Sequence, residues 1–496
     1  MAIAENVEGL LTTRPLSVVE NFFRSRTASG CYRSFQVTAT YNRSLKSDLR
    51  LFYLALKKTL LDYPILLTNV QFDEDGSCYV YKLLDKMELG GVLEIVEPAG
   101  YIDNGVVNEK FFKKINELTF ALYVAKPLFK LTLVGDFDLS AAFEHTIADG
   151  VVGNYFHEVF LENLALFDSD AKSDLFKEYG ITPESLESLD PNTPLFNIHT
   201  DAKFIKNSLP PPVDLFLEDM DLDYTCGDDC FFEKVIPPNF PTKWKGRFNA
   251  LDTHEIAFKL MNFTTEETKA ILQKCRDKKV TLTPYLEIIQ ALTLQPIFGD
   301  TEHTTHRFAM AMRRHFTPEK APPVYRKMLS DPKYKILGTS AHMGFKENLP
   351  PITEFSWELV EKINRHLLQG ISNTRALNQM KGFKDSADLT HCSNARFFDQ
   401  NLGFPKADAV KISNLGLVKL PEYDCGSHTW TITNMIFSQD MAPYASEFML
   451  SAITTPIGGL NLLLSYYDFS FEDTEYENFD HFIEMFKKNM INYSQT

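Results

Sequence analysis

One short stretch combines residue types that do acid–base chemistry with a spacing that brings them together. In AAFEHTIADGVVGNYF, residues 141–156, His145 follows an apolar run, Asp149 comes four residues later and Gly150 comes next. Neutral imidazole accepts a proton readily near neutral pH, so His145 is a candidate general base. Asp149 could orient the histidine or hold the turn, and Gly150 permits backbone conformations that other residues avoid.

The spacing alone does not establish this chemistry. The chain has 12 histidines, and a His-x-x-x-Asp pattern is expected by chance roughly once in a chain of this composition. The pattern occurs at a single place, His145. Without context it favours a structural histidine over a catalytic one, so the surrounding elements have to decide.

The elements around this motif are those of a mixed α/β (α+β) protein. The apolar run before His145 predicts a strand hairpin over 128–146, and the pattern after Asp149 predicts a helix. His145 is therefore expected at the end of a strand, where ligand crevices tend to lie. Further strands are predicted at 31–42, 307–314, 410–418, 428–436, 448–455 and 460–467, and further helices at 15–26, 47–64 and 356–371.

The composition along the chain predicts two comparable domains. Residues 167–245 are acidic and proline-rich, with prolines at 210, 211 and 212, which is typical of an extended crossover linker. We expect one domain over 1–166, carrying the motif, and a second over 246–496. At 496 residues the chain is long enough for each domain to have its own core.

Charge and cysteine usage exclude several classes of protein. The net charge of −16 argues against nucleic acid as a partner, because binding to phosphate backbones needs clustered cations. Seven scattered cysteines indicate free thiols in a reducing compartment, so a cytoplasmic protein is expected. The start of the chain lacks the pattern of a secretory signal, and no apolar run is long enough to span a membrane.

The motifs of other enzyme classes are missing. The chain has no Gly-x-Ser-x-Gly elbow, no GxGxxG and no phosphate-binding P-loop, which argues against hydrolase, hydride-transfer and nucleotide-hydrolysing classes. No HExxH occurs, and the close pair Cys226 and Cys230 lacks the spacing of a zinc site. We therefore expect no metal site.

In its context the motif resembles the HxxxDG acyltransferases, which include chloramphenicol acetyltransferase, the plant BAHD enzymes and condensation domains of peptide synthetases. Further segments resemble the fungal alcohol acetyltransferase family, in the family's order and over nearly the whole chain. They are RPLSVVENFF, CYRSF, YPILLTNV, TLTPYLEIIQAL, AMAMRR, GTSAHMGF and ISNLGLV. Two features depart from other branches. Glu144 stands where some carry a second histidine, and EYDCGSHTW at 422–430 does not match the plant DFGWG motif.

The resemblance implies two α/β domains with a tunnel between them, which acetyl-CoA enters from one side and the acceptor from the other. His145 would take the proton from the acceptor as it attacks the thioester, in direct transfer through a tetrahedral intermediate. Asp149 would point away from the substrate and pair with Arg313, with the neighbouring Arg314 as the alternative.

The resemblance also implies residues for the oxyanion and for coenzyme A. Ser413 and Asn414 would donate hydrogen bonds to the oxyanion, although Ser-Asn before glycine is also typical of a turn. A basic cluster before a predicted helix is a candidate for the coenzyme A phosphates, although a solvated face would look the same. Its residues, with a nearby threonine, are Lys274, Arg276, Lys278, Lys279 and Thr283.

The acceptor stays open between short alcohols, sterols and long-chain amino alcohols of the sphingoid type. The 40 phenylalanines suit an apolar acceptor tunnel. The apolar face predicted over 479–493 could pack on the protein body or contact a membrane surface, such as that of the endoplasmic reticulum or a lipid droplet. We expect a monomer. Two other functions remain, a non-catalytic relative that binds lipid or a partner, and an acyl-CoA thioesterase.

Overall fold

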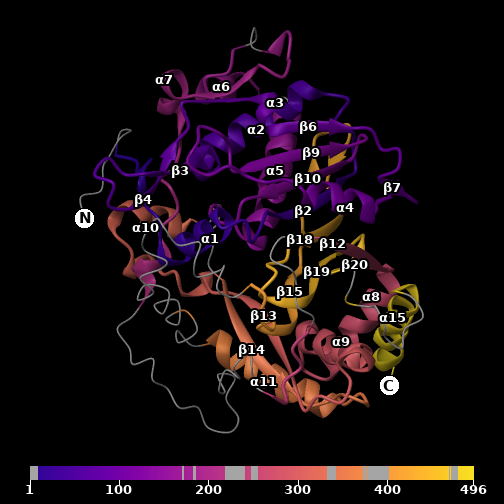
Figure 1. Ribbon diagram of the computed structural model, residues 1–496. Coiled ribbons are helices and arrows are strands. Elements are labelled where there is room, and N and C mark those ends of the chain that lie inside the picture. Colours follow the sequence, from indigo (N-terminus) through magenta and orange to yellow (C-terminus); the bar gives the residue numbers. More distant parts are fainter. Residues whose placement is uncertain are drawn as a thin grey trace.

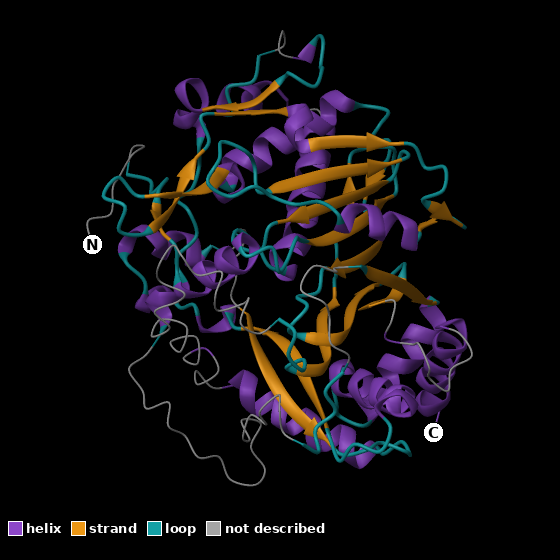
Figure 2. Ribbon diagram, in the orientation of Figure 1, coloured by secondary structure: helices purple, strands orange, loops and turns teal. Residues whose placement is uncertain are grey.

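The structure, a computed structural model, describes residues 9–169, 172–182, 186–217, 241–246, 255–331, 334, 342–372, 377, 402–467, 470 and 479–495. Figure 1 shows the order of its elements along the chain, and Figure 2 separates helices from strands. Cys226, Cys230 and much of the predicted linker lie outside the described residues. Four cysteines within them are free thiols, Cys31, Cys78, Cys275 and Cys425.

A five-stranded sheet forms the first half of the fold, in the order β18-β2-β10-β9-β6. Its strands are β2 (Phe35–Tyr41), β6 (Leu93–Val96), β9 (Phe129–Val134), β10 (Asp138–Phe143) and β18 (Ile432–Gln439). Strands β9 and β10 form the predicted hairpin, with Gly135 in the left-handed conformation (φ 59°) at its turn. The helices of this half are α1 (Val18–Ala28), α2 (Leu49–Asp62), α3 (Leu89–Val92), α4 (Glu109–Asn116) and α5 (Gly150–Asp168).

A six-stranded sheet forms the second half, in the order β12-β20-β19-β15-β13-β14. Its strands are β12 (Ile256–Phe263), β13 (Thr304–Ala311), β14 (His342–Leu349), β15 (Asp408–Leu417), β19 (Ser446–Thr455) and β20 (Gly459–Tyr467). Strands β13, β15 and β19 run parallel, and the outer pairs run antiparallel. Its helices are α8 (Thr265–Asp277), α9 (Leu282–Phe298), α10 (Pro323–Ser330), α11 (Trp357–Ser372) and α15 (Phe479–Gln495).

Short elements complete the described fold. They are β1 (Arg14–Pro15), β3 (Thr68–Phe72), β4 (Tyr79–Leu83), β5 (Lys86–Glu88), β7 (Ile102–Asp103), β8 (Val106–Val107), β11 (Pro194–Asn197), β16 (Tyr423–Asp424), β17 (Thr429–Trp430), α6 (Lys172–Glu178) and α7 (Ile198–Asp201). Two mixed sheets with helices packed on them confirm the predicted fold class. The division of the chain at residues 166 and 245 stays a prediction.

The two halves exchange segments that are distant in sequence. Strand β18 comes from the C-terminal part of the chain but pairs antiparallel with β2 in the first sheet (Figure 1). Its other side is tied to the second sheet, because Gln439 Nε2 donates to Ser451 Oγ at 2.9 Å and Asn461 Nδ2 donates to the Met435 carbonyl at 2.7 Å. In the other direction, Val19 and Phe23 of α1 belong to the hydrophobic core of the second half.

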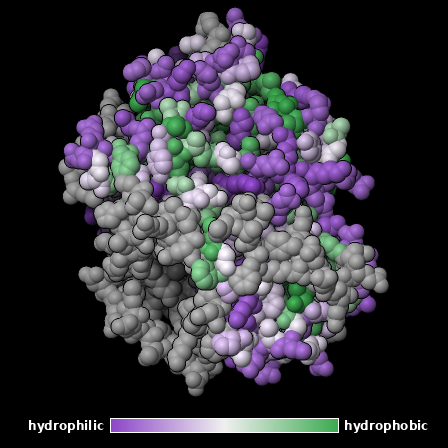
Figure 3. Space-filling model, viewed as in Figure 1, coloured by the Kyte–Doolittle hydropathy of each residue, from purple (hydrophilic) through white to green (hydrophobic). Residues whose placement is uncertain are grey.

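The C-terminal helix α15 packs on α8 and α9. Phe482, Ile483, Phe486 and Met490 on its apolar face are buried in the core of the second half. The apolar face predicted over 479–493 therefore covers the protein body and is not presented to a membrane. Among the coloured residues of the face seen in Figure 3, hydrophobic residues form only small scattered groups. Within the described residues, no helix is both long and apolar enough to cross a membrane.

Candidate active site

His145 lies in the short turn between β10 and α5, at the end of a central strand of the first sheet. Its side chain is buried, with 6% of its surface exposed. The imidazole stacks on the ring of Phe23 from α1, with centroids 4.0 Å apart and planes 11° apart, and lies 5.1 Å from the Phe35 ring. Aromatic packing from two other elements therefore fixes the plane of the ring.

Glu144 holds the turn on the side of α1. Its Oε2 accepts a hydrogen bond from the Thr146 amide and its Oε1 accepts one from the Thr27 hydroxyl, both at 2.6 Å. Burial raises the pKa of this carboxyl group, while hydrogen bonds and the charge of Arg26 lower it. Sequence reasoning noted Glu144 only as a departure from other branches, because its partner Thr27 is distant in sequence.

Asp149 holds the turn on the side of the second sheet. Its carboxylate is the N-cap of α5, where Oδ1 accepts a hydrogen bond from the Val152 amide at 3.1 Å. The same carboxylate lies 2.9 Å from Nη1 of Arg313, two residues beyond the end of β13. The ion pair implied by the resemblance is thus present with Arg313, whereas Arg314 is exposed.

Gly150 is the first residue of α5. We expected glycine here because of its backbone freedom, and this reason was wrong. Its backbone is not in the left-handed region. A Cβ atom at this position would come within 2.9 Å of both Leu415 Cδ2 and Phe437 Cζ. The glycine is needed because the start of α5 approaches β15 and β18 too closely for a side chain.

A cavity of about 60 Å³ joins these residues to the second sheet. Alternate residues of β15, Lys411 and Ser413, share its wall with two alanines of β13 and two residues of β18. Its full lining is His145, Asp149, Gly150, Val151, Ala309, Ala311, Lys411, Ser413, Asn414, Leu415, Phe437 and Gln439. The cavity therefore lies where the two halves meet, and His145 borders it.

The two oxyanion candidates are placed differently. Ser413 is buried and borders the cavity. Asn414 also borders it, but its Nδ2 donates to Thr283 Oγ1 at 3.1 Å and its Oδ1 accepts from the Gly416 amide at 2.8 Å. Asn414 thus makes the turn interaction that was expected as the alternative. Within the part of the chain that the structure describes, the Ser413 hydroxyl has no hydrogen-bond partner, so it is the more available donor.

The basic cluster lies outside this cavity. The Lys274 and Lys278 ammonium groups lie 6.0 and 5.5 Å from the centroid of the Trp357 ring. Arg276 and Lys279 are exposed at the end of α8. Thr283, in the first turn of α9, is the member that touches the site, through its hydrogen bond to Asn414.

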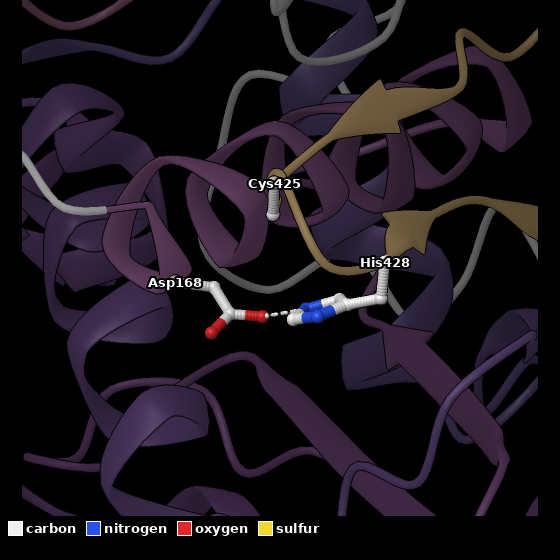
Figure 4. A group of neighbouring side chains, drawn as sticks. All are labelled: Asp168, Cys425 and His428. Carbon is white, nitrogen blue, oxygen red and sulfur yellow. Dashed lines mark hydrogen bonds and ion pairs between the residues drawn. The ribbon is translucent and has the colours of Figure 1, made fainter.

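A group of potential metal ligands lies elsewhere, where α5 ends against the β16–β17 hairpin. Figure 4 shows Asp168, Cys425 and His428, whose ligand atoms lie within 4.8 Å of one another. Nε2 of His428 and Nε1 of Trp430 both donate to Oδ2 of Asp168 at 2.6 Å. These hydrogen bonds hold the β16–β17 hairpin on the end of α5, and this structural role explains why the three side chains lie together.

Comparison with known proteins identifies the relatives of this fold. The family described as Alcohol acetyltransferase matches residues 16–490. No curated protein matches the chain by sequence. Among solved structures, TRI3 trichothecene 15-O-acetyltransferase from Fusarium sporotrichioides is similar with a TM-score of 0.63 and 11% identity, over 97% of this chain and 95% of that chain.

Two further structures share the fold. The epimerization domain from the third module of tyrocidine synthetase B has a TM-score of 0.60 and 11% identity, over 99% of this chain and 98% of that one. F. sporotrichioides TRI101, complexed with coenzyme A and T-2, has a TM-score of 0.56 and 11% identity, over 96% and 97% of the two chains. Because the family match spans nearly the whole described fold, the chain belongs to the alcohol acetyltransferase family of acyltransferases.

Proposed function

We propose that this protein transfers an acetyl group from acetyl-CoA to the hydroxyl or amine of a lipophilic alcohol or sphingoid-type amino alcohol, with His145 as the general base. One observation carries the proposal. His145 borders a cavity at the junction of the two halves, in a turn held to the second sheet by the ion pair of Asp149 and Arg313.

His145 would take the proton of the acceptor as its oxygen or nitrogen attacks the thioester carbonyl carbon. As the carbon–sulfur bond breaks, the imidazolium would return this proton to the departing thiolate, so that the free thiol of coenzyme A is released. Ser413 would donate a hydrogen bond to the oxyanion formed between these steps. Asp149 and Arg313 would act as positioning residues, because they hold the turn and do not need to touch the substrate.

The residues near Asn414 support the assignment of the coenzyme A side. Thr283 touches the cavity wall through Asn414, and four basic residues precede it at the end of α8, Lys274, Arg276, Lys278 and Lys279. Their charges suit the phosphates of coenzyme A. The structure similar in fold that was solved with coenzyme A supports the same co-substrate. The aromatic rings of Phe23, Phe35 and Phe437 around His145 suit a lipophilic acceptor.

Release of free thiol from acetyl-CoA tests the proposal. Purified protein would be assayed with a short alcohol, a sterol, a long-chain amino alcohol and no acceptor, with acetylated product measured by mass spectrometry. His145→Ala should lower acceptor-dependent release by about 10²-fold or more, the usual contribution of a general base. His199→Ala is the matched control, because His199 is exposed on α7.

The other two functions give different results in the same assay. Thiol release that is equal with and without acceptor would identify a thioesterase. No release with any acceptor, together with binding of a lipid, would identify a non-catalytic relative. Acceptor-dependent release that survives His145→Ala would refute the role assigned to the histidine.

A further inference from the structure

A second cavity, of about 250 Å³, adjoins the one at His145. The two share Lys411, which borders both. Most of the second cavity's wall is apolar or aromatic, and its charged members come from α1, β13, β15 and the segment after β18. The lining residues are Phe22, Arg26, Tyr32, Arg307, Ala407, Asp408, Lys411, Asp440, Met441, Ala442, Tyr444, Ala445, Ser446 and Met449.

The two acids in this wall already have partners. Oδ2 of Asp408 accepts a hydrogen bond from Nε of Arg307 at 2.6 Å, and its Oδ1 lies 3.4 Å from the Lys346 ammonium. Asp440 accepts hydrogen bonds from the Arg33 amide at 2.7 Å and from Asn116 Nδ2 at 3.2 Å. The charge of Asp408 is therefore balanced by two cations, and both carboxylate oxygens of Asp440 already accept hydrogen bonds.

Two cations in the same wall are not compensated in this way. The Arg26 guanidinium carbon lies 3.7 Å from the centroid of the Tyr32 ring and 4.6 Å from that of Phe23. Arg26 is 6% exposed, and neither its Nε nor its Nη2 has a hydrogen-bond partner among the described residues. Glu144, an acid whose pKa the charge of Arg26 lowers, accepts hydrogen bonds from Thr27 and Thr146.

Lys411 is the second of these cations. No hydrogen bond engages its ammonium within the described part of the chain. Burial lowers the pKa of Lys411 to about 7, and the charges of Arg26 and Arg307 lower it as well, while Asp408 raises it. Cationic groups removed from water favour a partner that brings negative charge, and neither side chain has a hydrogen-bonded acid among the described residues.

The position of this cavity points to the acceptor and not to coenzyme A. The candidate coenzyme A residues reach the His145 cavity through Thr283 and Asn414. Lys411 precedes Asn414 by three positions on β15, which is about 10 Å along a strand. The wall of the second cavity includes Phe22 and Arg26 of α1 and contains neither Thr283 nor Asn414. Its apolar lining suits an aliphatic tail, and its two bordering acids favour a ligand with a single negative charge.

Building on the proposed function, we propose that the second cavity binds the acceptor and that Arg26 and Lys411 hold a carboxylate group of it. The acceptor would then be a lipophilic hydroxy acid, not an amino alcohol, because a cationic amine would face both of these side chains. Nε and Nη2 lie along one edge of a guanidinium group, the edge that matches the two oxygens of a carboxylate.

Matched acceptors test this selectivity. The rate constant kcat/KM would be measured for hydroxydecanoic acids with the hydroxyl at the third or the last carbon, for their methyl esters and for decanol. Lys411→Met should lower kcat/KM for a hydroxy acid by about 10- to 100-fold, the usual cost of losing a hydrogen bond to a charged group. The loss should be smaller for the methyl esters and decanol, so the ratio of kcat/KM for the acid to kcat/KM for its ester should fall by about tenfold or more. Lys419→Met is the control, because Lys419 is exposed just beyond the same strand.

A binding measurement keeps this inference separate from the proposed function. Decanoate lacks a hydroxyl group and cannot be acetylated, so its dissociation constant is measured by calorimetry whether or not the protein is an enzyme. Lys411→Met and Arg26→Gln should each weaken decanoate binding by about tenfold or more.

Three results would overturn the inference. The first is equal loss of kcat/KM for acids, esters and decanol in Lys411→Met. The second is binding of decanoate that neither variant changes. The third is weakened binding of coenzyme A or inorganic phosphate with decanoate unaffected, which would assign the two cations to the co-substrate. Failure of every acceptor to release thiol, with decanoate bound as expected, would refute only the proposed enzymatic function.

Discussion

Replacing Asp149 by asparagine separates the two interactions of its carboxylate. Asparagine is as good an N-cap as aspartate, so the hydrogen bond to the Val152 amide can persist. The negative charge opposite Arg313 is lost. Only 4% of the Asp149 side chain and 10% of the Arg313 side chain are exposed, so the substitution removes a buried counter-charge of the arginine.

The structure sets the expected size of this effect. Removing one partner of a buried ion pair costs about 3–5 kcal/mol in the free energy of unfolding. The amide oxygen of asparagine still accepts a hydrogen bond from Arg313, worth about 1 kcal/mol. We therefore expect Asp149→Asn to lower the free energy of unfolding by about 2–4 kcal/mol. Asp149→Ala removes the helix cap as well as the ion pair, so it should cost about 1 kcal/mol more than loss of the ion pair alone.

A double-mutant cycle with Arg313→Met measures the pair directly. Unfolding by urea would be followed for the wild type, both single variants and the double variant. The double variant should be more stable than the sum of the single effects predicts, by about 2 kcal/mol, because each single variant removes the partner of a buried charge and the double variant removes both charges together. Arg314→Met serves as the control, since Arg314 is exposed.

The same variants should lower kcat for acetyl transfer while the KM for acetyl-CoA changes little, because the pair positions the turn of His145 and does not bind the co-substrate. Two results would refute this reasoning. One is a coupling energy below about 0.5 kcal/mol, within the range in which independent sites add. The other is wild-type kcat in a folded Asp149→Asn variant.

Three further predictions concern buried groups of the first half. Burial lowers the pKa of His157 from 6.5 to about 4, so stability present above about pH 6.5 is lost as the pH falls towards 4. In this range the free energy of unfolding of the wild type should fall by about 1.4 kcal/mol per pH unit through His157. Urea unfolding of His157→Gln should lack this contribution to the slope. Burial raises the pKa of Asp138 from 3.8 to about 6. The folded protein therefore favours the protonated carboxyl group, and it loses stability as the pH rises through 6 and this group ionises. Asp138→Asn should therefore gain about 3 kcal/mol at pH 8 relative to the wild type, and little at pH 4, in the same assay. Gly150→Ala should cost about 1–3 kcal/mol in calorimetric unfolding and lower kcat, because its Cβ would overlap Leu415 and Phe437; an unchanged enzyme would contradict the close packing.

The local elements were predictable because their signals are local. The hairpin before His145, the helix after Asp149 and the cap between them all follow from residues within a few positions of one another. The pairing of Asp149 with an arginine came from the resemblance, and only the fold distinguished Arg313 from its neighbour, since one faces the turn and the other the solvent.

Other parts of the site depend on contacts that no local pattern encodes. Lys411 looks like an ordinary strand lysine in the sequence, and its place between two cavities comes from the meeting of the two sheets. The contact of His428 with Asp168 joins residues 260 positions apart. Gly150 was singled out from the motif for its backbone freedom, but what the structure shows at this position is close packing against β15 and β18.

The placement of β18 has a consequence for how the chain can fold during synthesis. Until residues 432–439 have been made, the hydrogen-bonding edge of β2 that they cover stays open. An open strand edge pairs readily with other chains, so a fragment that ends before β18 should aggregate. The first half thus emerges from the ribosome with this edge uncovered and is closed only after residues 432–439 have been made. An N-terminal fragment that ends between α5 and β12 should therefore stay soluble only when a separately expressed C-terminal fragment supplies β18.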